Sequence, residues 1–275
     1  MKARRIGVFG CGTIGSELAR VVDSGSIRNA QLDSLFDINK DTAARLKSSL
    51  ASKPAVPHTE DGFFRGNFDL VIEAASQQAA RSIVVRCLEE ERDVMLMSAG
   101  ALADAEFLEL VSTASSKSGA RVYIPSGAVG GIDAIRSVRH LIDSITITST
   151  KNPRALSGAP YFEKSNTKAE SISGTTLLYE GSAEDAVKLF PANVNIAAVV
   201  SLAGIGARRT MVRVIADPSS SRNTHEIRLT GGFGEINLLM NNVPSPSNPK
   251  TSYLAVLSAI ECLRSICEGG IKVGS

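Results

Sequence analysis

The sequence has few cysteines, no long apolar run and almost no net charge, and each absence excludes a class of protein. The four cysteines, Cys11, Cys87, Cys262 and Cys267, have neither the spacing of a zinc site nor the density of a disulfide framework. We therefore expect no bound metal and a reducing compartment. No apolar run reaches the length of about eighteen residues that a membrane span needs. A formal net charge of +2 favours neither nucleic acid nor a lipid surface as a partner.

The basic start of the chain does not predict a secretion signal. The apolar stretch after residues 1–5 is interrupted by Gly10, Gly12 and Gly15 and is closed by Glu17. A signal peptide needs an unbroken apolar region, so we expect a cytoplasmic protein. A length of 275 residues suits two modest domains.

Short apolar runs alternate with helical patterns through the first half of the sequence. The apolar runs are 6–9, 32–36, 70–72, 94–97 and 122–124, and the helical stretches are 14–22, 41–50, 79–88 and 107–115. Nearly continuous apolar strands separated by helices are typical of a parallel sheet with both faces covered. We therefore predict an α/β fold, with a doubly wound, Rossmann-type domain over residues 1–140.

The pattern changes after about residue 141. Strands in which apolar and polar residues alternate are expected at 145–148, 211–215, 225–229 and 236–238, and helices at 184–189 and 196–202. Such alternation is typical of antiparallel strands with one covered face. Residues 141–245 are therefore predicted to form an α+β domain with an open sheet. Stretches rich in proline, serine and asparagine at 218–223 and 243–249 predict loops.

A final amphipathic helix is predicted over residues 249–268. Asn248 can cap it, and Pro249 fits the first helical position, where a missing N–H is harmless. The residues expected on its apolar face are Tyr253, Leu257, Ile260, Leu263 and Cys267. We expect this helix to pack back onto the first domain.

A glycine-rich motif, residues 10–15, directly follows the first strand and opens the first helix. In a dinucleotide site the first glycine makes the tight turn, the second admits the pyrophosphate, and the third lets helix and strand pack closely. The helix N-terminus then offers N–H groups to the phosphates. A merely structural strand–turn–helix is the alternative. The residues predicted to bind NAD here are Gly10, Gly12, Thr13, Ile14 and Gly15.

Asp37 ends the second strand, 22 residues beyond Gly15. A carboxylate at this position accepts hydrogen bonds from the ribose 2′-hydroxyl of NAD and repels the 2′-phosphate of NADP. NAD is therefore the expected cofactor, although Lys40, three residues later, leaves NADP possible. The alternative role for Asp37 is a helix N-cap.

Two further strand ends carry small residues, at 74–76 and 98–101. Ligands of doubly wound sheets bind beyond the carboxyl ends of the strands, so these turns are expected near the nicotinamide ribose. Ordinary turn chemistry is the alternative. The residues proposed for cofactor contact are Ala75, Ser76, Ala99 and Gly100.

Three segments in the second half carry a family resemblance. They are Ile-Pro-Ser-Gly-Ala at 124–128, Phe-Pro-Ala-Asn-Val-Asn-Ile-Ala at 190–197 and Asn-Thr-His-Glu-Ile at 223–227. Here the chain resembles the L-aspartate dehydrogenase family, and the resemblance runs essentially from end to end. The family joins a Rossmann domain to a C-terminal domain like that of dihydrodipicolinate reductase.

The resemblance implies NAD(P)-dependent oxidation of L-aspartate to iminoaspartate, or reductive amination of oxaloacetate with ammonia, in NAD biosynthesis. It implies His225 as the active-site histidine, and Ala128 and Asn195 as further dinucleotide contacts. It also implies a homodimer formed through the open sheet.

The residues themselves support a role for His225. On its expected strand, His225 shares a face with Ile227 and Leu229, and so it should point to a covered surface. Amine dehydrogenation needs a base for the ammonium proton, which a histidine that is neutral near pH 8 can provide. A core histidine with a satisfied hydrogen bond is the alternative.

The two carboxylates of L-aspartate call for cations or several N–H donors. Lys151 ends a strand and can supply a cation, although a solvated surface lysine gives the same pattern. Backbone N–H groups near Ser126 and Gly127, together with the start of the helix that follows, can also bind a carboxylate.

Two other functions remain open at this point. One is a related two-domain amino-acid or semialdehyde oxidoreductase, such as a homoserine dehydrogenase relative. The other is a regulatory module that binds NAD without turnover. The residues of the substrate pocket would discriminate among the three, and a sequence fixes those poorly.

Overall fold

The protein is described by a computed structural model that covers residues 3–191, 195–246 and 248–271. The chain divides into two compact units. Unit 1 comprises Met1–Ser98, Glu106–Pro125 and Val256–Ser275, and unit 2 comprises Ala99–Ala105 and Ser126–Ala255. Residues 126–140, which the sequence places in the first domain, therefore belong to unit 2. The reason is that helix α6 (Ile132–Val138) packs Ile135 into the core of that unit.

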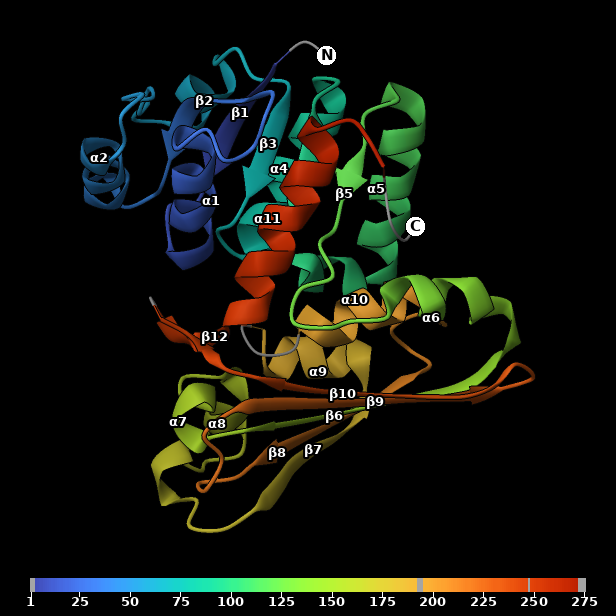
Figure 1. Ribbon diagram of the computed structural model, residues 1–275. Coiled ribbons are helices and arrows are strands. Elements are labelled where there is room, and N and C mark those ends of the chain that lie inside the picture. The colour runs from blue at the N-terminus through green and yellow to red at the C-terminus, as the bar shows by residue number, and fades with distance from the viewer. Residues whose placement is uncertain (1–2, 192–194, 247, 272–275) are drawn as a thin grey trace. The chain divides into compact units, whose positions relative to one another are not determined.

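Unit 1 is built on a five-stranded parallel sheet (Figure 1). Its strands are β1 (Arg4–Phe9), β2 (Ala30–Phe36), β3 (Leu70–Glu73), β4 (Asp93–Leu96) and β5 (Val122–Tyr123), in the order β2-β1-β3-β4-β5. All five predicted strands are present. The strand order reverses between β1 and β3, and ligands of such sheets bind where the strand ends diverge at a reversal of this kind.

Six helices described in unit 1 accompany this sheet. They are α1 (Thr13–Asp23), α2 (Lys40–Ser49), α3 (Glu60–Phe64), α4 (Gln77–Glu89), α5 (Ala105–Ser118) and α11 (Tyr253–Cys267). Only α3 was not predicted: its five residues are too few to show a period, although Thr59 caps it and Phe63 and Phe64 are buried. In the part of the chain that the structure describes, no helix is both long and apolar enough to cross a bilayer.

The final helix differs from its prediction at its start and in its apolar face. Residues Asn248–Ser252 form strand β12, which pairs with β11 (Pro244–Ser245), so the helix begins at Tyr253 rather than at Pro249. Tyr253 and Leu257, both predicted on the packed face, are exposed. Leu263 and Cys267, which were predicted on this face, join the core of unit 1, and so does Ala259, which was not.

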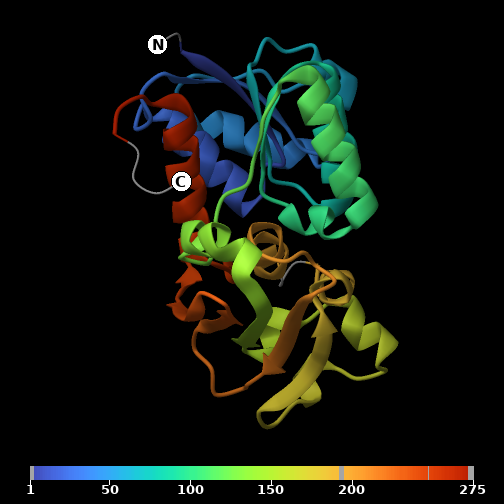
Figure 2. The same cartoon turned by 90° about the vertical axis from the view of Figure 1, so that its right-hand side faces the viewer.

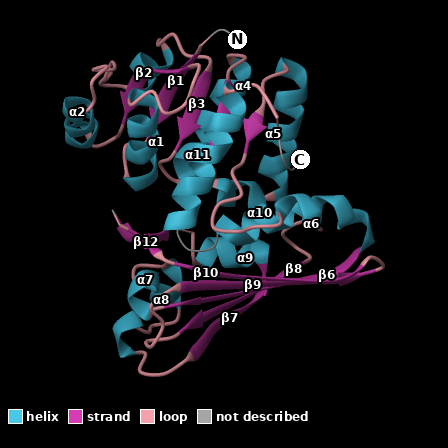
Figure 3. Cartoon of the chain, viewed as in Figure 1, coloured by secondary structure: helices cyan, strands magenta, loops and turns pink. Residues whose placement is uncertain are grey.

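Unit 2 contains a mixed five-stranded sheet (Figure 3). Its strands are β6 (Ile142–Lys151), β7 (Thr176–Ser182), β8 (Thr210–Ala216), β9 (Asn223–Gly231) and β10 (Gly234–Asn242), in the order β10-β9-β6-β8-β7. The expectation of antiparallel pairing is wrong for β6 and β8, which are parallel. Alternation of apolar and polar residues reports a covered face and not a strand direction. Strand β7 was missed because its register shifts between Leu177 and Tyr179, which breaks the alternation.

Helices cover one face of the unit 2 sheet (Figure 2). They are α6, α9 (Ala183–Leu189) and α10 (Asn195–Ala203), and the short helices α7 (Pro153–Leu156) and α8 (Pro160–Lys164) follow β6. Along β6 the covered face begins with Ile145 and Ile147 and ends with Ser149 and Lys151, all buried. Along β9 the order is reversed, because the buried polar residues Asn223 and His225 come before the buried apolar residues further along the strand. Four buried polar residues lie at this end of the two strands, and we call them the polar end of the sheet: Ser149, Lys151, Asn223 and His225.

Candidate active site

The glycine loop of unit 1 has a separate physical reason for each glycine. Gly10 has a φ of +97°, and a Cβ there would lie 2.6 Å from the backbone of Ala74. A Cβ on Gly15 would collide with the carbonyl oxygen of Gly10. Glycine at position 15 therefore lets the start of α1 pack closely against the end of β1. A Cβ on Gly12 would meet no atom within 4 Å. The second glycine therefore borders open space, as a position that admits a pyrophosphate should.

The N-terminus of α1 is suited to an anion. Gly12 is its N-cap and has no side chain to occupy the first N–H groups, and the first turn holds no acidic residue. The helix dipole and N–H groups of Thr13, Ile14 and Gly15 therefore favour a phosphate beside Gly12. The residues present fit a dinucleotide.

Asp37 is fixed beside this loop. Its carboxylate accepts hydrogen bonds from the N–H of Cys11 and from the N–H of Asn39, each at 2.8 Å. The N-cap of α2 is Asn39, whose side chain accepts from the N–H groups of Asp41 and Thr42. The alternative role of Asp37 as the helix cap is thus wrong, and its carboxylate stays half-buried at the end of β2.

A buried carboxyl group that the sequence analysis missed joins two strand ends. Glu73, fully buried at the end of β3, accepts from the N–H of Ala75 and from both the N–H and the hydroxyl of Ser98. Burial raises the pKa of Glu73, and these hydrogen bonds oppose that rise. An acidic residue after three apolar ones, Leu70–Ile72, was the available signal.

The small residues at the strand ends have different surroundings. Ser76 caps α4 by accepting from the N–H of Ala79 at 3.2 Å, which is the turn chemistry held open as the alternative. Ala99 and Gly100 are buried in the 3₁₀-helix η1 (Ala99–Ala103). The N–H of Gly100 donates to the side-chain oxygen of Asn195 at 3.3 Å. Two predicted cofactor positions, 95 residues apart, therefore meet inside unit 2.

His225 lies at the polar end of the unit 2 sheet and is 1% exposed. It faces Ser149 across the β6–β9 pair, and its Nδ1 lies 3.0 Å from the Ser149 hydroxyl. Its Nε2 is buried and has no hydrogen-bond partner among the described residues. Burial, and then the charge of Lys151, lower the pKa of His225 to about 3, so the ring is neutral in the substrate-free protein.

Lys151 ends β6 on the same face, with an exposure of 5%. A solvated surface lysine, the alternative left open by the sequence, is therefore excluded. Burial lowers the pKa of Lys151 to about 8. Lys151 lies two residues after Ser149 on the same face of β6, and Ser149 pairs with His225, so Lys151 and His225 are neighbours on the covered face.

The segment from Ser126 to Ala128 is held in place at Ala128. The carbonyl of Ala128 accepts from the side-chain N–H of Asn242, on β10, at 3.0 Å, and both residues are buried. The helix that the sequence predicts from Val129 begins only at Ile132, as α6. The role of Ser126 and Gly127 with a carboxylate stays a prediction.

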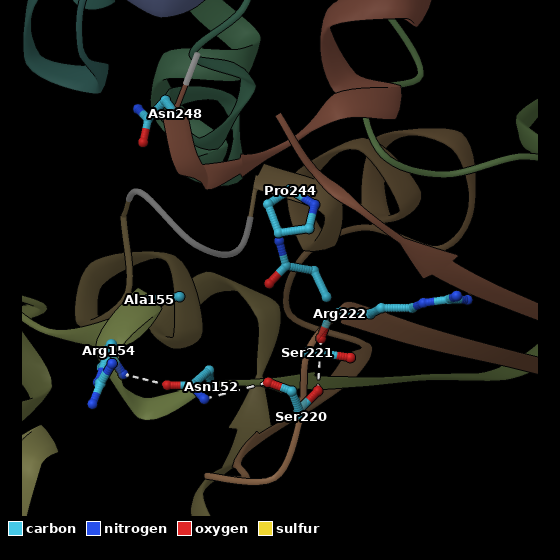
Figure 4. Close-up of a pocket in the computed structure, with 9 residues that line it drawn as sticks. Asn152, Arg154, Ala155, Ser220, Ser221, Arg222, Pro244 and Asn248 are labelled. Atoms are coloured by element: carbon cyan, nitrogen blue, oxygen red, sulfur yellow. Dashed lines mark hydrogen bonds between the residues drawn. The ribbon is translucent and has the colours of Figure 1, made fainter. Parts of the chain in front are cut away.

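A cavity of about 450 Å³ opens beside the polar end (Figure 4). Asn152, directly after Lys151, and Asn223, on the covered face with His225, both line it. Asn152 donates to the carbonyls of Pro218 and Ser220, which holds this wall in place. The other lining residues are Arg154, Ala155, Ser220, Ser221, Arg222, Pro244 and Asn248. The two arginines lie on opposite sides of the view and do not form one anion clamp.

Comparison with known proteins decides the family. A family model for the C-terminal domain of aspartate dehydrogenase matches residues 133–266, and one for the NAD-binding domain of homoserine dehydrogenase matches residues 10–125. L-aspartate dehydrogenase of Nitrosopumilus maritimus is 40% identical over 99% of this chain and 100% of its own. That of Methanosarcina barkeri is 49% identical over 95% and 96%. The chain belongs to the L-aspartate dehydrogenase family.

The fold agrees with the family. The crystal structure of aspartate dehydrogenase from Thermotoga maritima matches with a TM-score of 0.74 and 25% identity, over 99% of this chain and 100% of that one. The predicted resemblance and the predicted two-domain α/β fold are both confirmed. The homoserine dehydrogenase name belongs only to the model for the cofactor half and does not extend to residues 133–266.

Proposed function

We propose that this member of the family oxidises L-aspartate to iminoaspartate with NAD(P) and, in reverse, aminates oxaloacetate with ammonia. The observation that carries the proposal is the pairing at the polar end of a neutral, buried imidazole with a buried lysine. L-Aspartate presents an ammonium group and two carboxylates, and His225 and Lys151 match these groups in kind. The family membership of the whole chain supports the same substrate.

The reaction requires one proton transfer from substrate to protein. The substrate nitrogen arrives as –NH₃⁺ and must lose one proton before its electron pair can form the C=N bond. Nε2 of His225, which has no partner among the described residues, is the group available to take it. When bound, the nicotinamide supplies the acceptor for the hydride that leaves Cα. In the reverse direction the imidazolium of His225 returns the proton to nitrogen.

Lys151 has the role of a carboxylate partner. Its ammonium is charged below about pH 8 and is held out of solvent, where a charge-assisted hydrogen bond is strong. A bound carboxylate also offsets the charge of Lys151 at His225. Substrate binding therefore raises the pKa of His225 toward the range where an acid–base group works. Backbone N–H groups of Ser126 and Gly127 are the candidates for the second carboxylate.

For the cofactor we propose NAD over NADP. The carboxylate of Asp37 beside the glycine loop supports this choice, since a 2′-phosphate would meet its negative charge. Lys40, at the start of α2, is the residue that can soften the preference. Further contacts are proposed for Ala75, Ser76, Ala99, Gly100, Ala128 and Asn195.

We also propose a cytoplasmic homodimer that acts in NAD biosynthesis. The apolar side chains of Leu177, Met211 and Leu239 are 41–63% exposed on the outer face of the unit 2 sheet, which supports association there. Sedimentation analysis of the wild type and of a Leu239→Glu variant tests this assembly. A wild-type monomer would contradict it.

A screen of L-amino acids with NAD and NADP tests the function itself. Reduced cofactor should accumulate with L-aspartate and not with L-homoserine, L-glutamate or L-alanine. Oxaloacetate with ammonia should consume NADH in the reverse assay. Turnover of L-homoserine without L-aspartate would replace the proposal with the homoserine dehydrogenase alternative, and no turnover at all would favour the regulatory module.

A further inference from the structure

Ser149 and His225 form a buried, hydrogen-bonded pair on the covered face of the unit 2 sheet. They are directly opposed residues of β6 and β9, so their side chains leave neighbouring strands toward the same side. Both are at least 98% buried, and the Ser149 hydroxyl lies 3.0 Å from Nδ1 of His225. The register of the sheet therefore fixes which ring nitrogen meets the serine.

The other ring nitrogen is left unoccupied. Nε2 is buried, and no described residue bonds to it. A buried N–H without an acceptor is rarer and costlier in folded proteins than a buried acceptor without a donor. The ring proton therefore belongs on Nδ1, where the serine oxygen accepts it, and Nε2 carries a bare lone pair.

We propose that Ser149 is a positioning residue: its hydroxyl holds the His225 ring by Nδ1 and leaves Nε2 to exchange a proton with the substrate nitrogen. This inference rests on the proposed function and names the reacting atom and the residue that aims it. Nothing in the glycine loop or in the family segments singled out this serine.

A serine is chemically suited to this place. Its oxygen can accept from Nδ1–H in both the neutral ring and the imidazolium, so one hydrogen bond survives the whole proton cycle. A carboxylate at the same position would hold a positive charge on the ring. With a neutral hydroxyl partner, the charge that acts on the pKa of His225 among the described residues is that of Lys151. The protonation of His225 then follows what is bound to Lys151.

Nitrogen NMR of ¹⁵N-histidine-labelled protein tests the hydrogen bond without any substrate. The chain has only three histidines, His58, His140 and His225, so a His225→Asn variant assigns the signal. We expect the ring proton on Nδ1 in the wild type and a mixture of tautomers in Ser149→Ala. A proton on Nε2 in the wild type, or an unchanged signal in Ser149→Ala, would overturn the inference.

Steady-state kinetics test the consequence for catalysis. Ser149→Ala should lower kcat for L-aspartate about ten- to a hundredfold, the effect of leaving one buried polar group unpaired. The KM for NAD should stay within about twofold, because the affected ring acts on substrate. Ser149→Thr keeps the hydroxyl and should restore most of kcat. A Ser149→Ala enzyme with wild-type kcat would overturn the positioning role.

Thr210→Val is the matched control for lost stability. Thr210 is fully buried on the same covered face, and its hydroxyl donates to the carbonyl of Gly206 at 2.9 Å. It pairs with Ile145, four residues before Ser149, so its loss should lower stability and leave kcat and the His225 signal unchanged.

The remaining outcomes separate this inference from the proposed function. Should Ser149→Ala not fold, Ser149→Cys keeps the size with a weaker polar group, and the same shift of tautomers decides. Absence of L-aspartate turnover with the expected NMR shift would leave the positioning contact and remove the proposed function. L-Aspartate turnover by the wild type, with no NMR or kcat effect in Ser149→Ala, would support the proposed function and overturn the positioning role.

Discussion

In unit 1 the candidate cofactor site consists largely of backbone, whereas in unit 2 the candidate chemical site consists of buried side chains. The unit 1 site lies within one turn, Gly10–Gly15, and a carboxylate at the next strand end. The unit 2 site gathers Ser149 and Lys151 from β6 and His225 from β9, some 75 residues away. The first kind of site is local in the chain. The second exists only once the sheet has formed in register, so its integrity depends on the whole of unit 2.

The sharpest test of the side-chain site is His225→Asn. The amide keeps a polar group in place but cannot carry the proton, so kcat for L-aspartate should fall by about 10²–10⁴ with NAD affinity unchanged. His140→Asn, on an exposed histidine, is the matched control and should behave as wild type. Steady-state kinetics with both substrates varied measure the effect. Retention of most turnover by His225→Asn would make His225 a core residue and Lys151 the leading acid–base candidate.

The backbone site is tested by a contrast between two glycines. Gly12→Val should weaken NAD binding by about a hundredfold or more through lost phosphate contacts. It should change the free energy of unfolding by only about 0.5 kcal/mol, since no atom lies near its Cβ. Gly15→Val should instead destabilise unit 1, because its Cβ meets the Gly10 carbonyl. Calorimetric titration and thermal unfolding measure the two effects; wild-type NAD affinity in Gly12→Val would remove the glycine loop from the site.

The charge of Lys151 links the side-chain site to pH. Its pKa is lowered to about 8, so the ammonium is present below that pH and is lost as pH rises through it. The value of kcat/KM for L-aspartate should therefore fall above about pH 8, and the imidazole with its pKa near 3 should add no acid limb near neutrality. Lys151→Met should lower kcat/KM about ten- to a hundredfold at pH 7 and abolish this basic limb. A Lys151→Met enzyme that keeps the limb would assign it to another group.

The smallest expected effect concerns cofactor choice. Asp37→Ala should weaken NAD binding about tenfold, the effect of losing one charge-assisted hydrogen bond, and improve NADP relative to NAD. Asp41→Ala removes a neighbouring exposed carboxylate and serves as the control. The ratio of the two Michaelis constants is the measurement. An unchanged ratio in Asp37→Ala would place the ribose elsewhere.

The contrast between a local site and a site assembled across strands also explains how much of the fold could be predicted from the sequence. All five strands of unit 1 and four of its helices, α1, α2, α4 and α5, were predicted, because apolar runs and helical patterns are local signals. The mixed direction of the unit 2 sheet was not, because alternation is the same in parallel and antiparallel strands. Strand β7 was hidden by its register shift at Leu177.

For the candidate site residues, too, local patterns predict burial, and strand pairing decides which residues meet. His225 was found through a family segment, and its burial was read from the period of two that it shares with Ile227. That period, continued along β6 from Ile145 and Ile147, would also have found Ser149 and placed Lys151 inside. Which partner faces them depends on the pairing of β6 with β9, and no local pattern carries that information.

The place of α11 in the core of unit 1 has a consequence for biosynthesis. The strands of unit 1 leave the ribosome before residue 126, yet Ala259, Leu263 and Cys267, which follow unit 2 in the sequence, complete its core. At synthesis rates of about 5–20 residues per second, the residues from Ser126 to Ala255 separate the two events by roughly 7 to 26 seconds. During that interval the surface beneath α11 stays open to water and to chaperones. The core of unit 1 is therefore completed only after the residues of unit 2 have been synthesised.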